Sequence, residues 1–375
     1  MFAKPPDPHA ALQPYAEKVS TAQQALGQIR SGDHVFVGTG CAAPRSLVQA
    51  LETLEPSPAD IELLHFLTVK AFDHDAQGHC LTRFRHRTFF ASADLRQPIR
   101  EGRIEYVPIS ITRVPELMAL GRIAVDVALI QVSLPDAFGY VSLGVSVDII
   151  PAALAAARLV IAEVNPHMPH SLGDTSVHIS RIDHLVPVHT PVTEIERVPA
   201  QDETVQSIAR YIAHIIDDGS TLQVGLGYVA HEALQYLTDR KDLGLHCDVI
   251  TDAILPLLDK GCISGARKST QRFKIVTSLA LGTRRLYNLI NRNPLFDFQA
   301  IDVVCDPATI AAQHKMVSIA QAYAIDLTGQ VCIDQFGGEF YSGLGAQAEF
   351  LRGAARSPGG KPIICLTATS SDGQT

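Results

Sequence analysis

Short apolar runs alternate with helical patterns along the chain. The runs lie at residues 34–37, 61–68, 104–107, 125–132 and 159–164 in the first half, and at 221–224, 245–250, 273–277 and 301–304 in the second. Most of them are continuous rather than alternating, which is typical of strands buried on both faces of a parallel sheet. Leu47, Leu51 and Leu54 have helical spacing, and residues 207–216 predict an amphipathic helix. The pattern therefore predicts an α/β fold.

The two halves of the chain share a motif. SGDHVFVGTG, from residue 31, matches DGSTLQVGLG, from residue 218, at an offset of 187 residues, and Leu47 and Leu234 keep that offset. In each copy a strand ends in Gly-x-Gly, a helical pattern follows, and the next strand contains a histidine, His65 or His246. Strand-glycine-helix units are common in doubly wound sheets, so unrelated units could also look alike. We interpret the repeat as two similar, open, mainly parallel α/β domains, at 1–190 and 200–375. Proline and charged residues interrupt the alternation of strand and helix patterns at 186–202, where we place the boundary between the two domains.

Composition narrows the class of protein. The 375 residues suit two domains, and 46% hydrophobic with 19% charged residues indicates a globular chain. The net charge is -8 and no basic run occurs, which disfavours nucleic acid as a partner. No signal sequence is evident and no apolar stretch approaches the roughly 18 residues of a membrane span. Two open sheets leave exposed edges, which favours a homodimer.

The seven cysteines are scattered singly and form no Cys-x-x-Cys pair. An odd, unpaired set suits neither a disulfide framework nor a structural zinc site, so we expect a reducing cytoplasm. His74, His79, Cys80 and His86 lie close together in sequence, but they have no metal-ligand spacing and occur in a polar loop pattern. We expect no metal site.

One glycine motif could hold an anion. Gly225-Leu226-Gly227 follows a strand and opens a helix, so its backbone N–H groups could approach a pyrophosphate. With Ala230 it also fits the loose Gly-x-Gly-x-x-Ala dinucleotide pattern, and Asp248 follows at about the distance of a ribose-binding acid, some 20 residues on. However, residues 38–43 fit the same pattern, and tight strand-helix turns need glycine even without a ligand.

Carboxylates remain as the candidate reactive groups. No Gly-x-Ser-x-Gly elbow supports a serine hydrolase. Asp136, Asp174 and Asp248 stand beside glycine or at a predicted strand end or turn, where α/β folds place chemistry, although many such residues only cap turns. A second glycine-rich segment, 340–347, follows the turn predicted at Gly337-Gly338 and is a candidate for a loop near a ligand, with Gln347 as an amide donor.

Long segments of the chain resemble a known family. They are DVALIQVSLPDAFGYVSLGVSVDIIPAALAAARLVIAEVN from residue 126, MPHSLGDTSVHIS from 168, GLGYVAHEALQYLTDRKDLGLHCDVITDAI from 225, HKMVSIAQAYAIDLTGQV from 314 and YSGLGAQAEFLRG from 341. They closely resemble the acetyl-CoA hydrolase/CoA-transferase family, which includes acetate, butyrate and 4-hydroxybutyrate CoA-transferases. The similarity covers nearly the whole chain from about residue 31.

The resemblance implies ping-pong acyl transfer between an acyl-CoA and a small carboxylate such as acetate. A carboxylate attacks the thioester, and an acyl anhydride and then an enzyme-CoA thioester follow. By position Asp248 is the nucleophile, and coenzyme A is a substrate rather than a permanent cofactor. The positions implied to line the coenzyme A and thioester site are Gln223, Val224, Gly225, Leu226, Gly227, Ile319, Gly343 and Gly345.

The chain departs from the family pattern at several positions. Asp248 replaces the family's glutamate and is one methylene shorter, Gly343-Leu344-Gly345-Ala346 replaces Gly-x-Gly-Gly, and Ser318-Ile319-Ala320 replaces Ser-Ile-Asn. The family continues beyond the point where SSDGQT ends this sequence, so the resemblance implies an incomplete second domain. We therefore expect a CoA-transferase or acetyl-CoA hydrolase, with two alternatives: a coenzyme A-binding protein with impaired catalysis, or a nicotinamide-dependent oxidoreductase.

Overall fold

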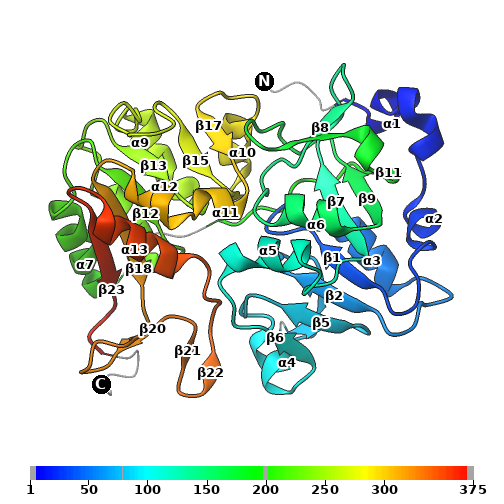
Figure 1. Ribbon diagram of the computed structural model, residues 1–375, viewed down its shortest axis with the longest axis horizontal. Helices are drawn as coiled ribbons and strands as arrows, with labels where there is room; N and C mark the ends of the chain where they lie inside the picture. Colours follow the sequence, from blue (N-terminus) through cyan, green and yellow to red (C-terminus); the bar gives the residue numbers. More distant parts are fainter. Residues whose placement is uncertain (1–5, 78, 197–201, 370–375) are drawn as a thin grey trace.

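The computed structural model describes residues 6–77, 79–196 and 202–369. Its N-terminal half, blue to green in Figure 1, is built on a seven-stranded sheet with the order β11-β9-β7-β1-β2-β5-β6, in which every pairing is parallel. The strands are β1 (His34–Val37), β2 (Glu62–His65), β5 (Arg85–Thr88), β6 (Ile104–Tyr106), β7 (Val127–Val132), β9 (Leu159–Val164) and β11 (His184–Pro187). The helices are α1 (Pro8–Ala11), α2 (Ala22–Leu26), α3 (Arg45–Glu52), α4 (Arg96–Arg100), α5 (Val114–Ala119) and α6 (Ile150–Ala156).

The C-terminal half, yellow-green to red in Figure 1, carries a six-stranded sheet with the order β17-β15-β13-β12-β18-β23, again parallel throughout. The strands are β12 (Thr221–Val224), β13 (Gly244–His246), β15 (Ile275–Thr277), β17 (Phe296–Phe298), β18 (Met316–Gln321) and β23 (Lys361–Cys365). The helices are α7 (Glu203–His214), α8 (Tyr228–Gln235), α9 (Leu255–Asp259), α10 (Arg284–Ile290), α11 (Ile301–Val304), α12 (Pro307–Ala311) and α13 (Gln347–Arg356).

Five two-stranded sheets complete the described fold. They pair β3 (Asp73–His74) with β4 (Cys80–Leu81), β8 (Tyr140–Ser142) with β10 (Ser176–His178), β14 (Val249–Thr251) with β16 (Leu279–Leu281), β19 (Ala324–Ile325) with β20 (Val331–Cys332), and β21 (Gln335–Phe336) with β22 (Glu339–Phe340). The predicted turn at Gly337-Gly338 joins the last pair, and both glycines have positive φ.

The two sheets repeat one topology, as the sequence repeat predicts. β1 and β12 are the equivalent strands at the offset of 187 residues, and each lies between the strand that follows it and a strand from later in its half. The continuous apolar runs are buried on both faces: Phe36 packs into one core cluster, whereas Val35 and Val37 pack into another against α2 and α3. The predicted α/β class with two similar parallel sheets is confirmed.

Two predicted strands differ in the structure. Residues 301–304 form helix α11 rather than a strand, because Ile301 and Val304 point into the core while Asp302 and Val303 face outward, which is helical spacing. The run 245–250 is divided into β13 and β14, with Cys247 and Asp248 between them. A short continuous apolar run does not distinguish these cases by itself.

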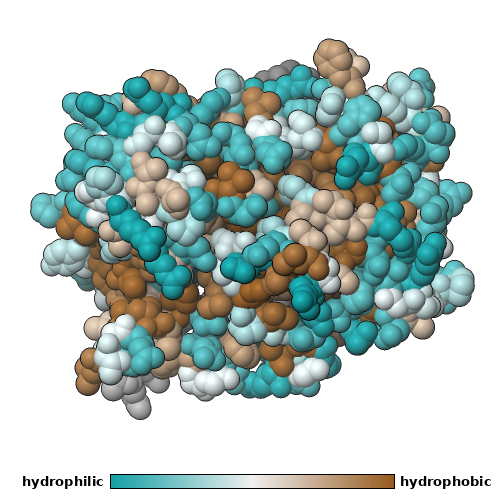
Figure 2. Space-filling model, in the orientation of Figure 1, coloured by the Kyte–Doolittle hydropathy of each residue, from teal (hydrophilic) through white to brown (hydrophobic). Residues whose placement is uncertain are grey.

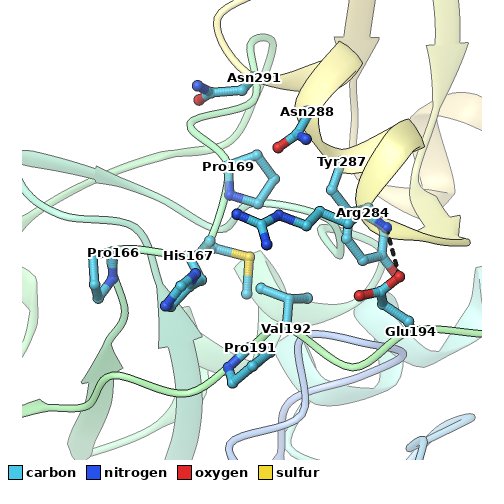
Figure 3. Close-up of a pocket in the computed structure, with 11 residues that line it drawn as sticks. Pro166, His167, Pro169, Pro191, Val192, Glu194, Arg284, Tyr287, Asn288 and Asn291 are labelled. Atoms are coloured by element: carbon cyan, nitrogen blue, oxygen red, sulfur yellow. Dashed lines mark hydrogen bonds between the residues drawn. The ribbon is translucent and has the colours of Figure 1, made fainter. Parts of the chain in front are cut away.

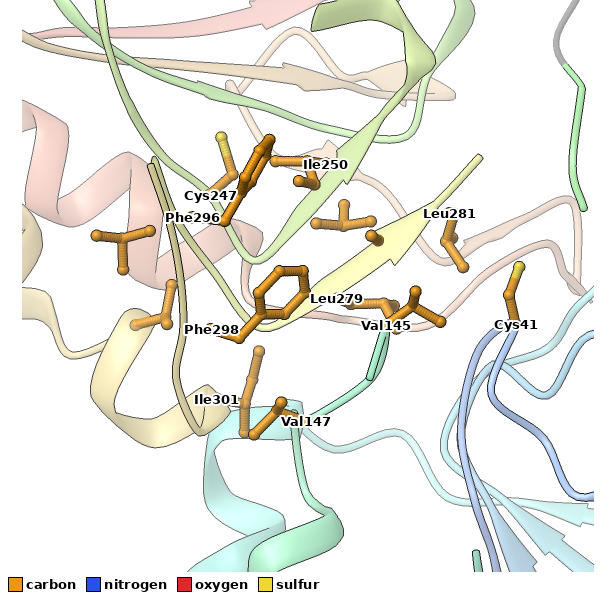
Figure 4. Packing of buried hydrophobic residues seen from close by; sticks show 14 of the residues in the cluster. Cys41, Val145, Val147, Cys247, Ile250, Leu279, Leu281, Phe296, Phe298 and Ile301 are labelled. Carbon is orange, nitrogen blue, oxygen red and sulfur yellow. The ribbon is translucent and has the colours of Figure 1, made fainter. Parts of the chain in front are cut away.

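One apolar core joins the two halves. Figure 4 shows Phe298 and Ile301 of the C-terminal half facing Val147 of the N-terminal half, and all three are buried in the same cluster. Backbone hydrogen bonds reinforce the contact: Phe298 N–H donates to Leu172 at 2.8 Å, and Ala280 N–H donates to Val145 at 2.8 Å. The halves are therefore held by packing and by strand-like pairing, which fixes residues of both around any cavity between them.

The predicted domain boundary, 186–202, lies partly outside the described residues, which resume at Asp202 before α7. The limits 1–190 and 200–375 stay a prediction. No helix within the described ranges is long and apolar enough to cross a membrane.

Candidate active site

A cavity of about 430 Å³ lies between the two halves, at the carboxyl ends of several strands. Figure 2 shows hydrophobic side chains gathered along the seam between the halves in the lower part of the view. The predicted site residues that line the cavity are Gln223, Gly225, Leu226, Gly227, Asp248, Gly343 and Gly345. Val224 and Ile319 do not line it. Their side chains are buried in the core, and the Ile319 carbonyl accepts a 2.9 Å hydrogen bond from Gly225 N–H, so they support the loop from behind.

Asp248 is placed by a break in two neighbouring strands. Between β13 and β14 the chain leaves the six-stranded sheet, and between β15 and β16 Ser278 interrupts the adjacent strand in the same way. Ser278 N–H donates to the Asp248 carbonyl at 3.2 Å, and Val147 N–H, from the other half, donates to the Ser278 carbonyl at 2.9 Å. The carboxylate is thus held at a strand end on the interface, rather than on a free loop.

A buried hydrogen-bond chain orients a donor towards this carboxylate. Ser318 Oγ donates to Gln223 Oε1 at 2.7 Å, and Gln223 Nε2 donates to Asp248 Oδ1 at 3.3 Å. Gln223 and Ser318 are paired residues on the adjacent strands β12 and β18, and both are almost fully buried. Because an ionised carboxylate only accepts hydrogen bonds, the amide presents its NH₂ group to Asp248, and its oxygen then accepts from the serine hydroxyl.

Burial raises the pKa of the Asp248 carboxyl to about 6, while the Gln223 hydrogen bond lowers it and the charge of Glu349 adds to the rise. The Glu349 carboxylate stands on α13, where Ser110 Oγ donates to it at 2.8 Å. Near pH 7 Asp248 is therefore ionised, yet more basic than an exposed aspartate, which makes it a better nucleophile.

Each of the two glycine loops has a neighbouring group packed where a side chain would otherwise be. A Cβ on Gly227 would lie 2.3 Å from Oε1 of Gln321, whose carboxamide accepts a 3.1 Å bond from Val229 N–H at the start of α8. Gln321 therefore occupies a backbone N–H at the start of α8 that, in the dinucleotide pattern, would bind a pyrophosphate. A Cβ on Gly343 would lie 2.7 Å from the Phe89 carbonyl, so the second loop packs directly on the end of β5.

Known proteins with similar sequences decide the family. The model of the acetyl-CoA hydrolase/transferase N-terminal domain matches residues 6–208, and that of the C-terminal domain matches residues 282–375. The chain belongs to the acetyl-CoA hydrolase/transferase family. The resemblance seen in the sequence is confirmed, and relatives that are enzymes support enzymatic activity.

Three relatives illustrate the similarity. The chain is 37% identical to 4-hydroxybutyrate coenzyme A transferase of Clostridium kluyveri, over 96% of this chain and 83% of that protein. It is 35% identical to succinyl-CoA:acetate/propanoyl-CoA:succinate CoA transferase of Fasciola hepatica, over 95% and 75%. The crystal structure of RipA from Yersinia pestis matches with a TM-score of 0.88 and 32% identity, over 98% of this chain and 85% of that one.

The cavity of this family member contains a carboxyl that sequence reasoning missed. Asp148 of the N-terminal half lines it, accepts a 2.5 Å hydrogen bond from Thr39 Oγ1, and is buried, which raises its pKa to about 6. It stands within the family-like segment from residue 126, but a buried VSVDII run gives no sign that the aspartate faces a cavity shared with the other half. Arg96 also lines the cavity, and its guanidinium donates to the Tyr341 carbonyl at 2.6 Å.

The other candidate residues lie elsewhere or serve the backbone. Asp136 accepts 2.9 Å bonds from Phe138 and Tyr140 N–H in a turn, and Asp174 is exposed outside the cavity. Of the histidine group, His74 contacts Asp94, His79 contacts Asp75, and His86 contacts the buried His65. Gln347 does line the cavity, and its Oε1 is buried without a partner among the described residues.

Proposed function

We propose that this chain catalyses acyl-CoA:carboxylate CoA transfer with Asp248 as the nucleophile. The observation that carries the proposal is the Ser318–Gln223–Asp248 hydrogen-bond chain, which presents one carboxylate to the cavity between the halves. Coenzyme A and a small carboxylate such as acetate are the substrates, as the names of the transferase relatives suggest.

The reaction begins when an Asp248 carboxylate oxygen attacks the thioester carbonyl. The C–S bond breaks, the coenzyme A thiolate leaves, and an acyl-aspartyl anhydride forms. The thiolate then attacks the aspartyl carbonyl, which releases the first carboxylate and leaves an aspartyl-CoA thioester. The acceptor carboxylate attacks that thioester, a new anhydride forms, and the returning thiolate takes the new acyl group and frees Asp248. No net proton is consumed.

Positioning supplies most of the rate in this scheme. A free carboxylate is a weak nucleophile, so binding energy from the remote parts of coenzyme A must hold it in attack geometry. The Gln223 amide fixes one oxygen of Asp248, and backbone N–H groups of the Gly343–Gly345 loop would stabilise the developing oxyanion. We place the coenzyme A chain along Gln223–Gly227, with Val224 and Ile319 beneath it.

Hydrolysis is a branch of the same pathway. If water rather than a carboxylate attacks the anhydride or the aspartyl-CoA thioester, the net product is a free acid, coenzyme A and a proton. Asp248 is shorter than the family's glutamate, and the space this leaves favours entry of water. The nicotinamide alternative loses support because Gln321 meets the helix start at Gly227.

The deciding experiment is an acyl exchange assay with acetyl-CoA and labelled acetate. Asp248→Ala should abolish exchange, whereas the matched variant Asp174→Ala, an exposed aspartate outside the cavity, should keep it. Full turnover by Asp248→Ala would refute the assignment. Calorimetry that shows coenzyme A binding to the native chain without any exchange would instead support a binding protein with impaired catalysis.

The cellular setting is part of the proposal. All seven cysteines are free, and six of them are buried, which supports a reducing compartment; we therefore place the protein in the cytoplasm. The homodimer expected from the open sheet edges stays a prediction.

A further inference from the structure

A second cavity, of about 370 Å³, lies between the two halves and shares no lining residue with the one that contains Asp248. Its N-terminal side is formed by the loop after β9, at Pro166–Pro169, and by the loop after β11, at Pro191, Val192 and Glu194. Its C-terminal side is formed by one face of α10 and the residue that follows it. The cavity therefore has an apolar wall of prolines and aliphatic groups and a polar wall from a helix.

Arg284 is the dominant charge in this cavity. Figure 3 shows its side chain crossing the cavity towards His167 and Pro169. Among the described residues its guanidinium has no ion pair and no hydrogen bond that would occupy it, whereas Glu194, an acid on the opposite wall, accepts a 2.8 Å bond from the Arg284 backbone N–H. The five guanidinium N–H donors of this exposed side chain thus remain available at the cavity.

The surroundings add positive potential and further donors. Arg45 donates to the Pro191 carbonyl at 2.9 Å. Burial lowers the pKa of His170, and the nearby charge of Arg292 lowers it further. Burial and the charges of His189 and Arg284 also lower the pKa of His167. Arg284, Arg45 and Arg292 thus lie on or beside a cavity whose one lining carboxylate among the described residues is Glu194.

Asparagine amides complete the polar wall. Asn291 Oδ1 accepts a 2.9 Å bond from His170 N–H, which leaves its NH₂ group as a donor, and Asn288 lines the cavity one turn earlier. The Tyr287 hydroxyl is committed elsewhere, since it donates to the Thr193 carbonyl at 2.9 Å. Arg284, Asn288 and Asn291 line the same cavity, and guanidinium and amide N–H groups can recognise the oxygens of a phosphate or carboxylate.

We propose that this cavity is a binding site, separate from the site of acyl transfer, for a small organic anion. Arg284 and the Asn288 and Asn291 amides hold its phosphate or carboxylate group, and the proline wall covers its carbon frame. The cavity volume exceeds that of a bare oxyanion and is within the range of small-molecule sites. Because both halves line the cavity, a bound anion bridges them and stabilises their docked arrangement.

Calorimetry with model ligands tests this proposal. The probes are phenyl phosphate, benzoate, inorganic phosphate and uncharged benzyl alcohol. Phenyl phosphate or benzoate should bind with one-to-one stoichiometry, several-fold more tightly than inorganic phosphate, and benzyl alcohol should not bind. Whichever aromatic anion binds more tightly identifies the preferred head group. Binding by neither, or equal binding of benzyl alcohol, would overturn the proposal.

Variants of α10 locate the bound anion. Arg284→Ala should weaken binding by about tenfold or more, because it removes a charge-assisted bidentate contact. Arg284→Lys should be intermediate, since it keeps the charge without the planar fork. Arg285→Ala is the matched control: its guanidinium pairs with Asp259 at 2.6 Å, outside the cavity. Equal weakening in Arg284→Ala and Arg285→Ala would refute the site. The titrations contain no acyl-CoA, so their outcome is independent of whether Asp248 catalyses transfer.

Discussion

Ser318→Ala isolates the contribution of the hydrogen-bond chain at Asp248. The variant removes the donor that Gln223 Oε1 receives at 2.7 Å, so the amide is free to turn its oxygen towards the carboxylate. Leaving a buried acceptor unpaired costs about 1–3 kcal/mol. If this free energy is added to the barrier for attack of Asp248 on the thioester, kcat for exchange falls by roughly 5- to 150-fold. The fold should remain intact, because the change removes one hydroxyl from a buried strand.

The pH profile separates this effect from a general loss of stability. Asp248 must be ionised to attack, and burial raises its pKa to about 6, so the native rate should fall as the pH drops through this value. The Gln223 bond lowers that pKa, so Ser318→Ala should move the acid limb to higher pH. The control is Ser220→Ala, immediately before β12, because Ser220 Oγ is buried with no partner among the described residues. Equal kcat and equal acid limbs in the two variants would refute the reasoning.

Three further predictions concern chemistry and stability. Asp248→Glu restores the side-chain length of the family's glutamate. If the shorter side chain limits attack on the thioester, the variant should raise the exchange rate by up to about 100-fold. An unchanged or lower rate in the labelled-acetate assay would show that side-chain length is not limiting. Burial raises the pKa of Glu163 from 4.5 to about 7, so the folded state holds a proton that the unfolded state has lost, and stability falls as pH rises across this window. In urea denaturation, the free energy of unfolding should fall between pH 4 and pH 8, and this fall should be about 3 kcal/mol smaller in Glu163→Gln than in the native chain. The same fall in both proteins would contradict the prediction. Phe298→Ala opens the shared core and should cost about 3–5 kcal/mol in urea, whereas a loss below 1 kcal/mol would mean that the halves do not depend on it.

Much of the fold follows from the sequence because the repeat and the buried strands are local signals. The runs 34–37, 159–164 and 221–224 coincide with β1, β9 and β12, since a continuous apolar run between turns fits a central parallel strand. The error at 301–304 has the same origin: four apolar-rich residues carry too little periodicity to separate a helical turn from a strand.

Only those parts of the site that are encoded within one half of the chain could be predicted from the sequence. The motifs led to Asp248 and to the glycine loops, because each stands at a strand end within one half. Asp148 and the Arg284 cavity depend on how the halves dock, and no pattern within either half encodes that geometry. The Ser318–Gln223 bond is likewise set by the register of β12 and β18, which are separated by about a hundred residues of sequence.

Mass spectrometry of the peptide that contains Asp248 tests the central claim most directly. After the chain is mixed with acetyl-CoA and quenched in acid, the account predicts a peptide heavier by coenzyme A less one water, attached through Asp248. The adduct should disappear when excess acetate is added before the quench, and it should never form in Asp248→Ala. Labelled exchange at a normal rate with no adduct, or an adduct on another residue, would contradict the account.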